Sequence, residues 1–325
     1  MKFCEVFVIF RRNVIKFRLT LLLPCGYVSS EDNGMVTTAK RHHVTLWQRW
    51  LSGAFRGQPP STEGSFILYL SSMNIRDFDL WCRSFLQIDT LRETDDSLNG
   101  IQVSRGPQPL KRLGFAVDAC VETFQRAVQG GADLLFVHHG LFWGKASRIE
   151  EPLLERLRIL LENNLALYAC HLPLDMHPEV GNNAVLANLL ALEDRKPFGV
   201  YHGVAIGVSG SLPSPMDIDT LVRTILPDLS APRLLIAPER TMISKVAIVS
   251  GGAAFEAFQA FGTDIDLYIT GEPSHSVYHG VVEAGLGFLA AGHYATETWG
   301  VKAMAEKASR ELGLETFFID LPTGL

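Results

Sequence analysis

Several features that define other protein classes are missing from this sequence. No apolar run reaches the roughly 18 residues that a membrane-spanning helix needs. The apolar run at residues 19–23 is also too short for a secretory signal, and the residues that follow it, 24–26, are a poor cleavage or lipidation site. We therefore expect no membrane association and a cytoplasmic location.

Cysteine is scarce as well. The five cysteines are odd in number, widely spaced and never form a C-x-x-C pair. This pattern fits reduced thiols in a cytoplasm better than a disulfide framework, and we interpret the cysteines as core residues. They are Cys4, Cys25, Cys82, Cys120 and Cys170.

Basic residues are too few for a protein that binds nucleic acid by neutralising phosphates. The chain has 29 Lys and Arg against 35 Asp and Glu, a formal net charge of -6. The distribution is uneven, because residues 1–72 hold nine basic against four acidic residues and the remainder holds twenty against thirty-one. The body of the protein is therefore acidic, and we do not expect nucleic acid as a partner.

The first 72 residues differ in character from the rest. They mix aromatic and basic residues and end in a Pro, Gly and Ser-rich tract at 56–64. An amphipathic helical pattern begins after Met73. We interpret residues 1–72 as a disordered extension or as the product of a misassigned start, with Met73 as the true first residue.

Alternating strand and helix patterns predict the fold class from there onward. Residues 93–103 read as a loop, after which strands at 113–120, 132–137 and 165–170 alternate with helices, which we expect at 121–130 and 152–163. Such spacing is typical of βαβ crossovers in a parallel or mixed sheet flanked by helices. The sequence therefore predicts an α/β protein.

A second α/β unit follows from about residue 196. We expect a strand at 199–212, a helix at 216–226 and a helix at 253–261, with further strands at 234–237, 245–250, 266–270 and 287–291. The turn Ser250-Gly251-Gly252 lacks the P-loop and dinucleotide-binding patterns, so we interpret it as a plain tight turn. A last helix should run from 292 to about 312.

Adjacent histidines end the buried strand at 132–137. His138 and His139 precede Gly140, whose freedom to turn lets both rings face one cavity. Because open α/β sheets bind ligands at the carboxyl ends of their strands, paired imidazoles there suggest a divalent metal site. The alternative is one packed histidine and one exposed histidine without a ligand.

The strand at 165–170 is also followed by polar side chains. Asp175 offers an anionic oxygen suited to a divalent ion, whereas His171 and His177 are candidates for proton transfer, support of a ligand or simple packing. The residues Gly181-Asn182-Asn183 read as an N-cap of the next helix.

His293 and Glu297 lie four residues apart where the last strand meets its helix, so they share one helical face. Together with His138, His139 and Asp175 they exceed the ligands of one tetrahedral site. Two neighbouring divalent ions bridged by a carboxylate are therefore a plausible interpretation.

Several segments resemble one known family. V-H-H-G-L-F-W at 137–143, H-L-P-L-D-M-H-P-E-V-G-N-N-A at 171–184, I-T-G-E at 269–272 and G-H-Y-A-T-E at 292–297 are similar to motifs of the GTP cyclohydrolase I type 2 homologues, the Nif-three-like proteins. The shorter cues N-G-I-Q-V at 99–103 and F-I-D-L-P at 318–322 agree. The resemblance covers residues 73–325.

The resemblance implies two related α/β domains with mixed sheets, the second inserted in the first. We expect a metal-binding domain at 73–196 plus 285–325 and an inserted domain at 197–284. It further implies a ring-shaped homohexamer and two divalent ions per subunit, zinc, iron or manganese, with His279 as a possible catalytic or substrate group. The implied ligands are His138, His139, Asp175, His293 and Glu297.

Two functions remain open at this point. The ligand set favours metal-dependent hydrolysis of a nucleotide or a related phosphorylated small molecule. The alternative is a metal-binding or interaction scaffold without catalysis. An accessible pocket beside the metal ligands would favour the enzyme, and a closed site would favour the scaffold.

Overall fold

The computed structural model describes residues 9–10, 13–14, 73–226 and 231–325. The chain divides into two compact units, Met1–Pro60 and Ser61–Leu325. Of the first unit the structure describes β1 (Ile9–Phe10), which pairs antiparallel with β2 (Asn13–Val14). The interpretation of residues 1–72 as an extension, and of Cys4 and Cys25 as core residues, otherwise lies outside the described residues.

The second unit contains two sheets, and the first has five strands in the order β13-β4-β5-β6-β3. Its strands β13, β4, β5 and β6 pair in parallel, and β3 pairs antiparallel with β6. The strand bounds are β3 (Gly100–Val103), β4 (Arg112–Asp118), β5 (Leu134–His139), β6 (Ala166–Ala169) and β13 (Glu315–Phe318). The expectation of a loop throughout 93–103 was wrong, because a four-residue edge strand is too short to show a periodic pattern.

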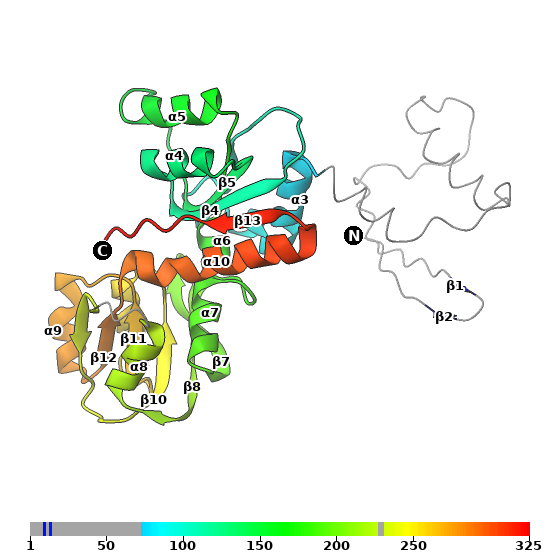
Figure 1. Ribbon diagram of the computed structural model, residues 1–325. Coiled ribbons are helices and arrows are strands. Elements are labelled where there is room, and N and C mark those ends of the chain that lie inside the picture. Colours follow the sequence, from blue (N-terminus) through cyan, green and yellow to red (C-terminus); the bar gives the residue numbers. More distant parts are fainter. Residues whose placement is uncertain (1–8, 11–12, 15–72, 227–230) are drawn as a thin grey trace, which may run out of the picture. The chain divides into compact units, whose positions relative to one another are not determined.

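Helices flank this first sheet (Figure 1). The first of them begins with a capping box, in which Asn74 and Asp77 satisfy each other's backbone N–H groups. Its apolar stripe packs into the core with β4 and β5, as the sequence predicted. These helices are α3 (Ile75–Leu86), η1 (Ile88–Leu91), α4 (Val121–Gln129) and α5 (Leu153–Glu162).

The second sheet has the order β7-β8-β10-β11-β12-β9, with parallel pairing from β10 to β12 and antiparallel pairing elsewhere. The expected strand at 199–212 is not a single strand. It covers the end of β7, a turn and most of β8, which together form a hairpin. His202 and Gly203 both have positive φ, 47° and 83°, as a tight hairpin turn requires. The bounds are β7 (Glu193–Tyr201), β8 (Val204–Met216), β9 (Leu234–Ile236), β10 (Ile243–Ile248), β11 (Leu267–Thr270) and β12 (Gly287–Ala290).

The remaining helices are α6 (Leu172–Asp175), α7 (Asn182–Leu189), α8 (Ile218–Ile225), η2 (Ala254–Ala260), α9 (His275–Glu283) and α10 (His293–Leu312). The helix expected at 253–261 is a 3-10 helix, η2. The N-cap of α7 is Gly181 and not an asparagine, because the side chains of Asn182 and Asn183 bond elsewhere, to Asp175, Ile206 and Ser250.

Helix α10 joins the two halves of this unit (Figure 1). Val301 and Met304 are buried against the first sheet, whereas Ala295 and Trp299 pack on the core of the second. The first turn of α10 therefore lies where both sheets can contribute side chains.

The prediction of a mixed α/β fold with two helix-flanked sheets is confirmed. All strands of the second sheet lie between β6 and β13 in the sequence, from residue 193 to residue 290. The second sheet therefore begins before the expected boundary at 196 and extends past the one at 285, and those domain boundaries stay a prediction. Within the described residues, no helix combines the length and the apolar character that crossing a membrane requires.

Candidate metal centre

The carboxyl end of β5 carries two histidines, and the Nδ1 atom of each ring contacts another part of the chain. His138 is fully buried, and its Nδ1 donates to the carbonyl of Cys170 at 3.0 Å. His139 Nδ1 lies 2.8 Å from Asp118 Oδ1. Since a carbonyl can only accept, the Nδ1 of His138 carries a proton, and its Nε2 is the ligand-type atom of the neutral ring.

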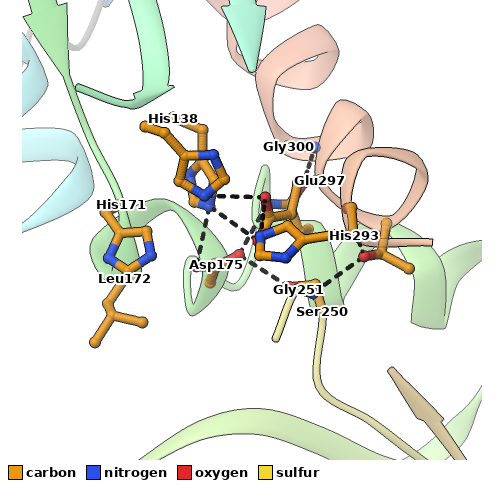
Figure 2. A network of polar contacts seen from close by, with 12 residues as sticks. His138, His171, Leu172, Asp175, Ser250, Gly251, His293, Glu297 and Gly300 are labelled. Carbon is orange, nitrogen blue, oxygen red and sulfur yellow. Dashed lines mark hydrogen bonds and ion pairs between the residues drawn. The ribbon is translucent and has the colours of Figure 1, made fainter. Parts of the chain in front are cut away.

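The first turn of α10 brings His293 and Glu297 to the same place (Figure 2). Glu297 Oε2 lies 3.1 Å from His293 Nε2 and 3.2 Å from His139 Nε2. Its other oxygen, Oε1, lies 3.4 Å from His138 Nε2. Glu272 orients the ring of His293, because Glu272 Oε1 lies 2.6 Å from His293 Nδ1.

Asp175, at the end of α6, completes the group. Its Oδ1 accepts hydrogen bonds from Asn182 Nδ2 at 2.8 Å and from Ser250 Oγ at 2.9 Å. Its Oδ2 is left to face His138 Nε2 at 3.4 Å. The five residues named from the sequence therefore converge, although they span 160 positions of the chain.

The turn at 250–252 forms one wall of this centre. Gly251 has φ +70°, and a Cβ there would overlap Glu297 Oε1. Its N–H donates to Thr296 Oγ1 at 3.0 Å. Sequence reasoning correctly saw a turn but missed its place at the site. The available signal was a Ser-Gly-Gly turn at the carboxyl end of a buried strand.

Two buried polar atoms of this group lack a hydrogen-bond partner. His138 Nε2 and Glu297 Oε2 make no hydrogen bond to any part of the chain that the structure describes. A buried nitrogen or oxygen atom without a hydrogen-bond partner costs free energy, and a bound cation would satisfy both of these atoms. Three sets of ligand atoms, each within 4.8 Å, could hold a metal ion: His138, Asp175 and Glu297; His139, His293 and Glu297; and His138, His139 and His171.

The electrostatics also favour a cation. Burial opposes protonation of His138, but the charges of Asp175 and Glu297 outweigh it and raise the pKa of that ring well above its usual value. Burial likewise opposes the charge on His293, yet Glu297 and Glu272 raise its pKa to about 9. Without metal, the carboxylates thus attract protons, which a divalent ion would replace.

His171 belongs to this group, beyond the expected set of five. Its Nδ1 lies 2.9 Å from Asp95 Oδ1, and its ring centroid is 5.1 Å from that of His138. Burial raises the pKa of Asp95, but the bond from His171 opposes this, and the net shift of that pKa is downward. Asp95 was missed from the sequence because it lies in a loop 76 residues away.

The other two candidate histidines lie elsewhere. His177 Nε2 lies 3.0 Å from the carbonyl of Phe85, and its Nδ1 accepts from the backbone N–H groups of Glu179 and Val180. His279 is exposed on α9. Neither residue joins the metal-ligand groups among the described residues.

A cavity of about 350 Å³ opens beside the centre. Asp175, His293 and Glu297 form part of its wall, together with His171. The group is therefore accessible to a small molecule from one side.

The match to known proteins agrees with this geometry. The profile of the family described as Duf34/NIF3 (NGG1p interacting factor 3) matches residues 73–323. The chain belongs to the Duf34/NIF3 family. The resemblance inferred from the sequence motifs, and its start at Met73, are thus confirmed.

Duf34/NIF3 relatives span most of the chain. Proteins called GTP cyclohydrolase 1 type 2 homolog from Treponema pallidum and Archaeoglobus fulgidus are 37% and 40% identical, and each match covers 78% of this chain and 100% of the relative. TTHA1606 from Thermus thermophilus, known from a crystal structure, is 38% identical with a TM-score of 0.70, and the solved protein ybgI, described as of unknown function, is 33% identical with a TM-score of 0.71. Both structural matches cover 78% of this chain and all of the solved chain.

Proposed function

We propose that this protein is a hydrolase that uses two divalent metal ions to act on a nucleotide or a related phosphorylated small molecule. The observation that carries the proposal is the position of Glu297. Its two oxygens face different nitrogen ligands, Oε1 toward His138 and Oε2 toward His139 and His293. The name of the relatives, GTP cyclohydrolase 1 type 2 homolog, supports a nucleotide as substrate.

Two ligand sets would share the Glu297 carboxylate. His138 and Asp175 belong with Oε1, and His139 and His293 belong with Oε2. Mixed imidazole and carboxylate ligands suit zinc, iron or manganese. Bound there, such ions would supply Lewis acidity and an activated water.

The surrounding side chains position these ligands. Asp118 and Glu272 fix the rings of His139 and His293, and Ser250 fixes the Asp175 carboxylate. His171 lies at the cavity wall and is held by Asp95, which suits transfer of a proton to or from the substrate.

A metal-binding scaffold without catalysis is the alternative. The cavity beside the ligands favours the enzyme, because a structural metal site has no need of an open side.

We further propose that the protein works as a ring-shaped homohexamer, as the family resemblance implies. Exposed apolar side chains in the second half of the chain support an interface there. Phe255, Tyr278 and Val282 are 54%, 41% and 46% exposed.

Replacing Glu297 by Gln tests the metal centre, because this change keeps the size of the side chain but removes the bridging charge. We expect metal content to fall and turnover to drop at least about a hundredfold, the upper end of what removing a supporting residue costs. The measurements are elemental analysis of untagged protein and release of formate or phosphate from GTP and other nucleotides. The matched control is Glu306→Gln, an exposed position on the same helix.

Absence of turnover across the nucleotide panel, with metal bound, would favour the scaffold. Equal turnover in the wild type and in Glu297→Gln would remove the bridging role.

A further inference from the structure

We propose that the cavity beside the metal centre binds the planar, N–H-bearing heterocycle of the substrate, through Trp143, Asp96 and Glu256, and leaves the phosphate groups of the substrate to the metal centre. The inference rests on the proposed function for what happens at the metal centre. It names the part of the substrate that the cavity recognises.

The cavity is small and has walls of two kinds. Its volume of about 350 Å³ lies at the lower end of the roughly 300–1,000 Å³ typical of ligand pockets. Leu172, Ile206 and Val249 form an apolar part of the lining, and Trp143 and Tyr201 add aromatic rings. The unpartnered, buried Glu297 Oε2 belongs to a residue that lines the same cavity. The cavity and the metal centre are therefore continuous.

Trp143 is fixed in place yet partly open. Its Nε1 donates to the carbonyl of Gly140 at 3.1 Å, and its ring meets His171 edge to face with 4.9 Å between centroids. The residue is nevertheless 37% exposed. A held indole with free surface at the cavity suits stacking of a flat ring, because little side-chain entropy is lost on binding.

The negative charges of the cavity lining favour flat ligands that carry N–H donors. Asp96 and Glu256 make no side-chain hydrogen bond or ion pair to the described residues, so both carboxylates are free acceptors for N–H donors. Five carboxylates line the cavity, and no Lys or Arg of the described chain does. Asp96 and Glu256 are not among the candidate metal ligands, so their charges would disfavour a phosphate at that part of the lining. The five are Asp95, Asp96, Asp175, Glu256 and Glu297.

Calorimetric titration of the full chain tests the inference. The probes are guanosine, inosine, which lacks one amino donor, and inorganic tripolyphosphate. We expect guanosine to bind, inosine to bind more weakly, and tripolyphosphate not to displace guanosine. Trp143→Leu should weaken guanosine binding at least about tenfold, in line with the loss of one stacking contact.

Matched variants separate local effects from general ones. Glu256→Gln should weaken guanosine more than inosine, whereas Glu283→Gln, at an exposed position on α9, should change neither. Leu161→Ala removes an exposed apolar side chain of α5, outside both the cavity and the proposed interface, and should leave binding unchanged.

Three outcomes would overturn the inference: tripolyphosphate displacing guanosine, guanosine binding that is unaffected by Trp143→Leu, or no binding of any nucleoside. Failure of the proposed hydrolysis is distinguishable from these. In that case guanosine would still bind in a Trp143-dependent way while no nucleotide is turned over. Conversely, if Trp143→Leu does not change the turnover of phosphate esters, the inference about the cavity fails while the proposed hydrolase function stands.

Discussion

At the residue scale, three histidine rings at the metal centre are each held at Nδ1, so that Nε2 faces the Glu297 carboxylate. Cys170, Asp118 and Glu272 hold His138, His139 and His293 by Nδ1. This arrangement fixes ring orientation before any metal binds and thereby lowers the cost of binding. Gly251 contributes to the same site, because its lack of a side chain lets the backbone pass close to Glu297.

Gly251→Ala should damage the metal centre. The added Cβ would meet Glu297 Oε1, so Glu297 or the turn must move, and we expect a loss of bound metal with a fall of about 2–4 kcal/mol in the free energy of unfolding. Elemental analysis and urea denaturation measure the two effects.

Gly262→Ala is a closely matched control. Gly262 has the same φ of +70°, but nothing lies within 4 Å of its would-be Cβ. It should show the backbone cost, about 1 kcal/mol, and keep its metal. Equal metal loss in both variants would mean that the contact with Glu297 is irrelevant.

At the element scale, a partly buried carboxylate anchors strand ends far from the metal centre. Asp133, just before β5, accepts from the backbone N–H groups of Lys111 and Arg112 at 2.7 and 3.0 Å. It also pairs with Arg105 at 2.6 Å, whose side chain is only 8% exposed. One carboxylate thus fixes the starts of β4 and β5, whose other ends carry Asp118 and the two histidines.

Asp133→Asn should destabilise the protein in a pH-dependent way. Burial raises the pKa of Asp133, but its bonds with Arg105 and the two N–H groups outweigh burial and lower it below the usual value. Because the folded pKa lies below the unfolded value of about 3.9, the stabilisation is present above that pH and is lost as the pH falls through the folded pKa.

We therefore expect the variant to lose about 1–2 kcal/mol at pH 7, since solvent screens part of the interaction, and progressively less below pH 4. Urea denaturation across pH measures the difference. Asp194→Asn is the control, because Asp194 is exposed and its positive φ is tolerated by Asn. A deficit that does not shrink in acid would contradict the assignment.

At the scale of the whole molecule, the described part of the second unit carries two sheets and all five candidate metal ligands after residue 73. The Duf34/NIF3 profile begins at the same residue. A chain that starts at Met73 should therefore keep the thermal midpoint, the metal content and the assembly of the full protein. Light scattering of the full chain should give a mass six times the 35.9 kDa of one subunit. A lower thermal midpoint, less metal or a smaller assembly on truncation would show that residues 1–72 contribute.

The sequence by itself determined the α/β class, the buried strands and the position of polar residues at the strand ends. These follow from local periodicity and from the rule that ligands lie at the carboxyl ends of strands. His138 and His139 end β5, whereas Asp175 ends the short helix after β6, and His293 and Glu297 lie in the first turns of the helix after β12. All five could therefore be named from segments that follow the carboxyl ends of strands.

Tertiary structure alone decided which of those side chains meet. The hairpin β7–β8, the edge strand β3 and the supporting residues Asp95 and Glu272 depend on contacts between distant segments. The same holds for the Ser250 turn against Asp175, 75 residues away, and for His177, which the carbonyl of Phe85 holds outside the site. Local propensity carries no information about such pairs, because their geometry is fixed only when both sheets pack against α10.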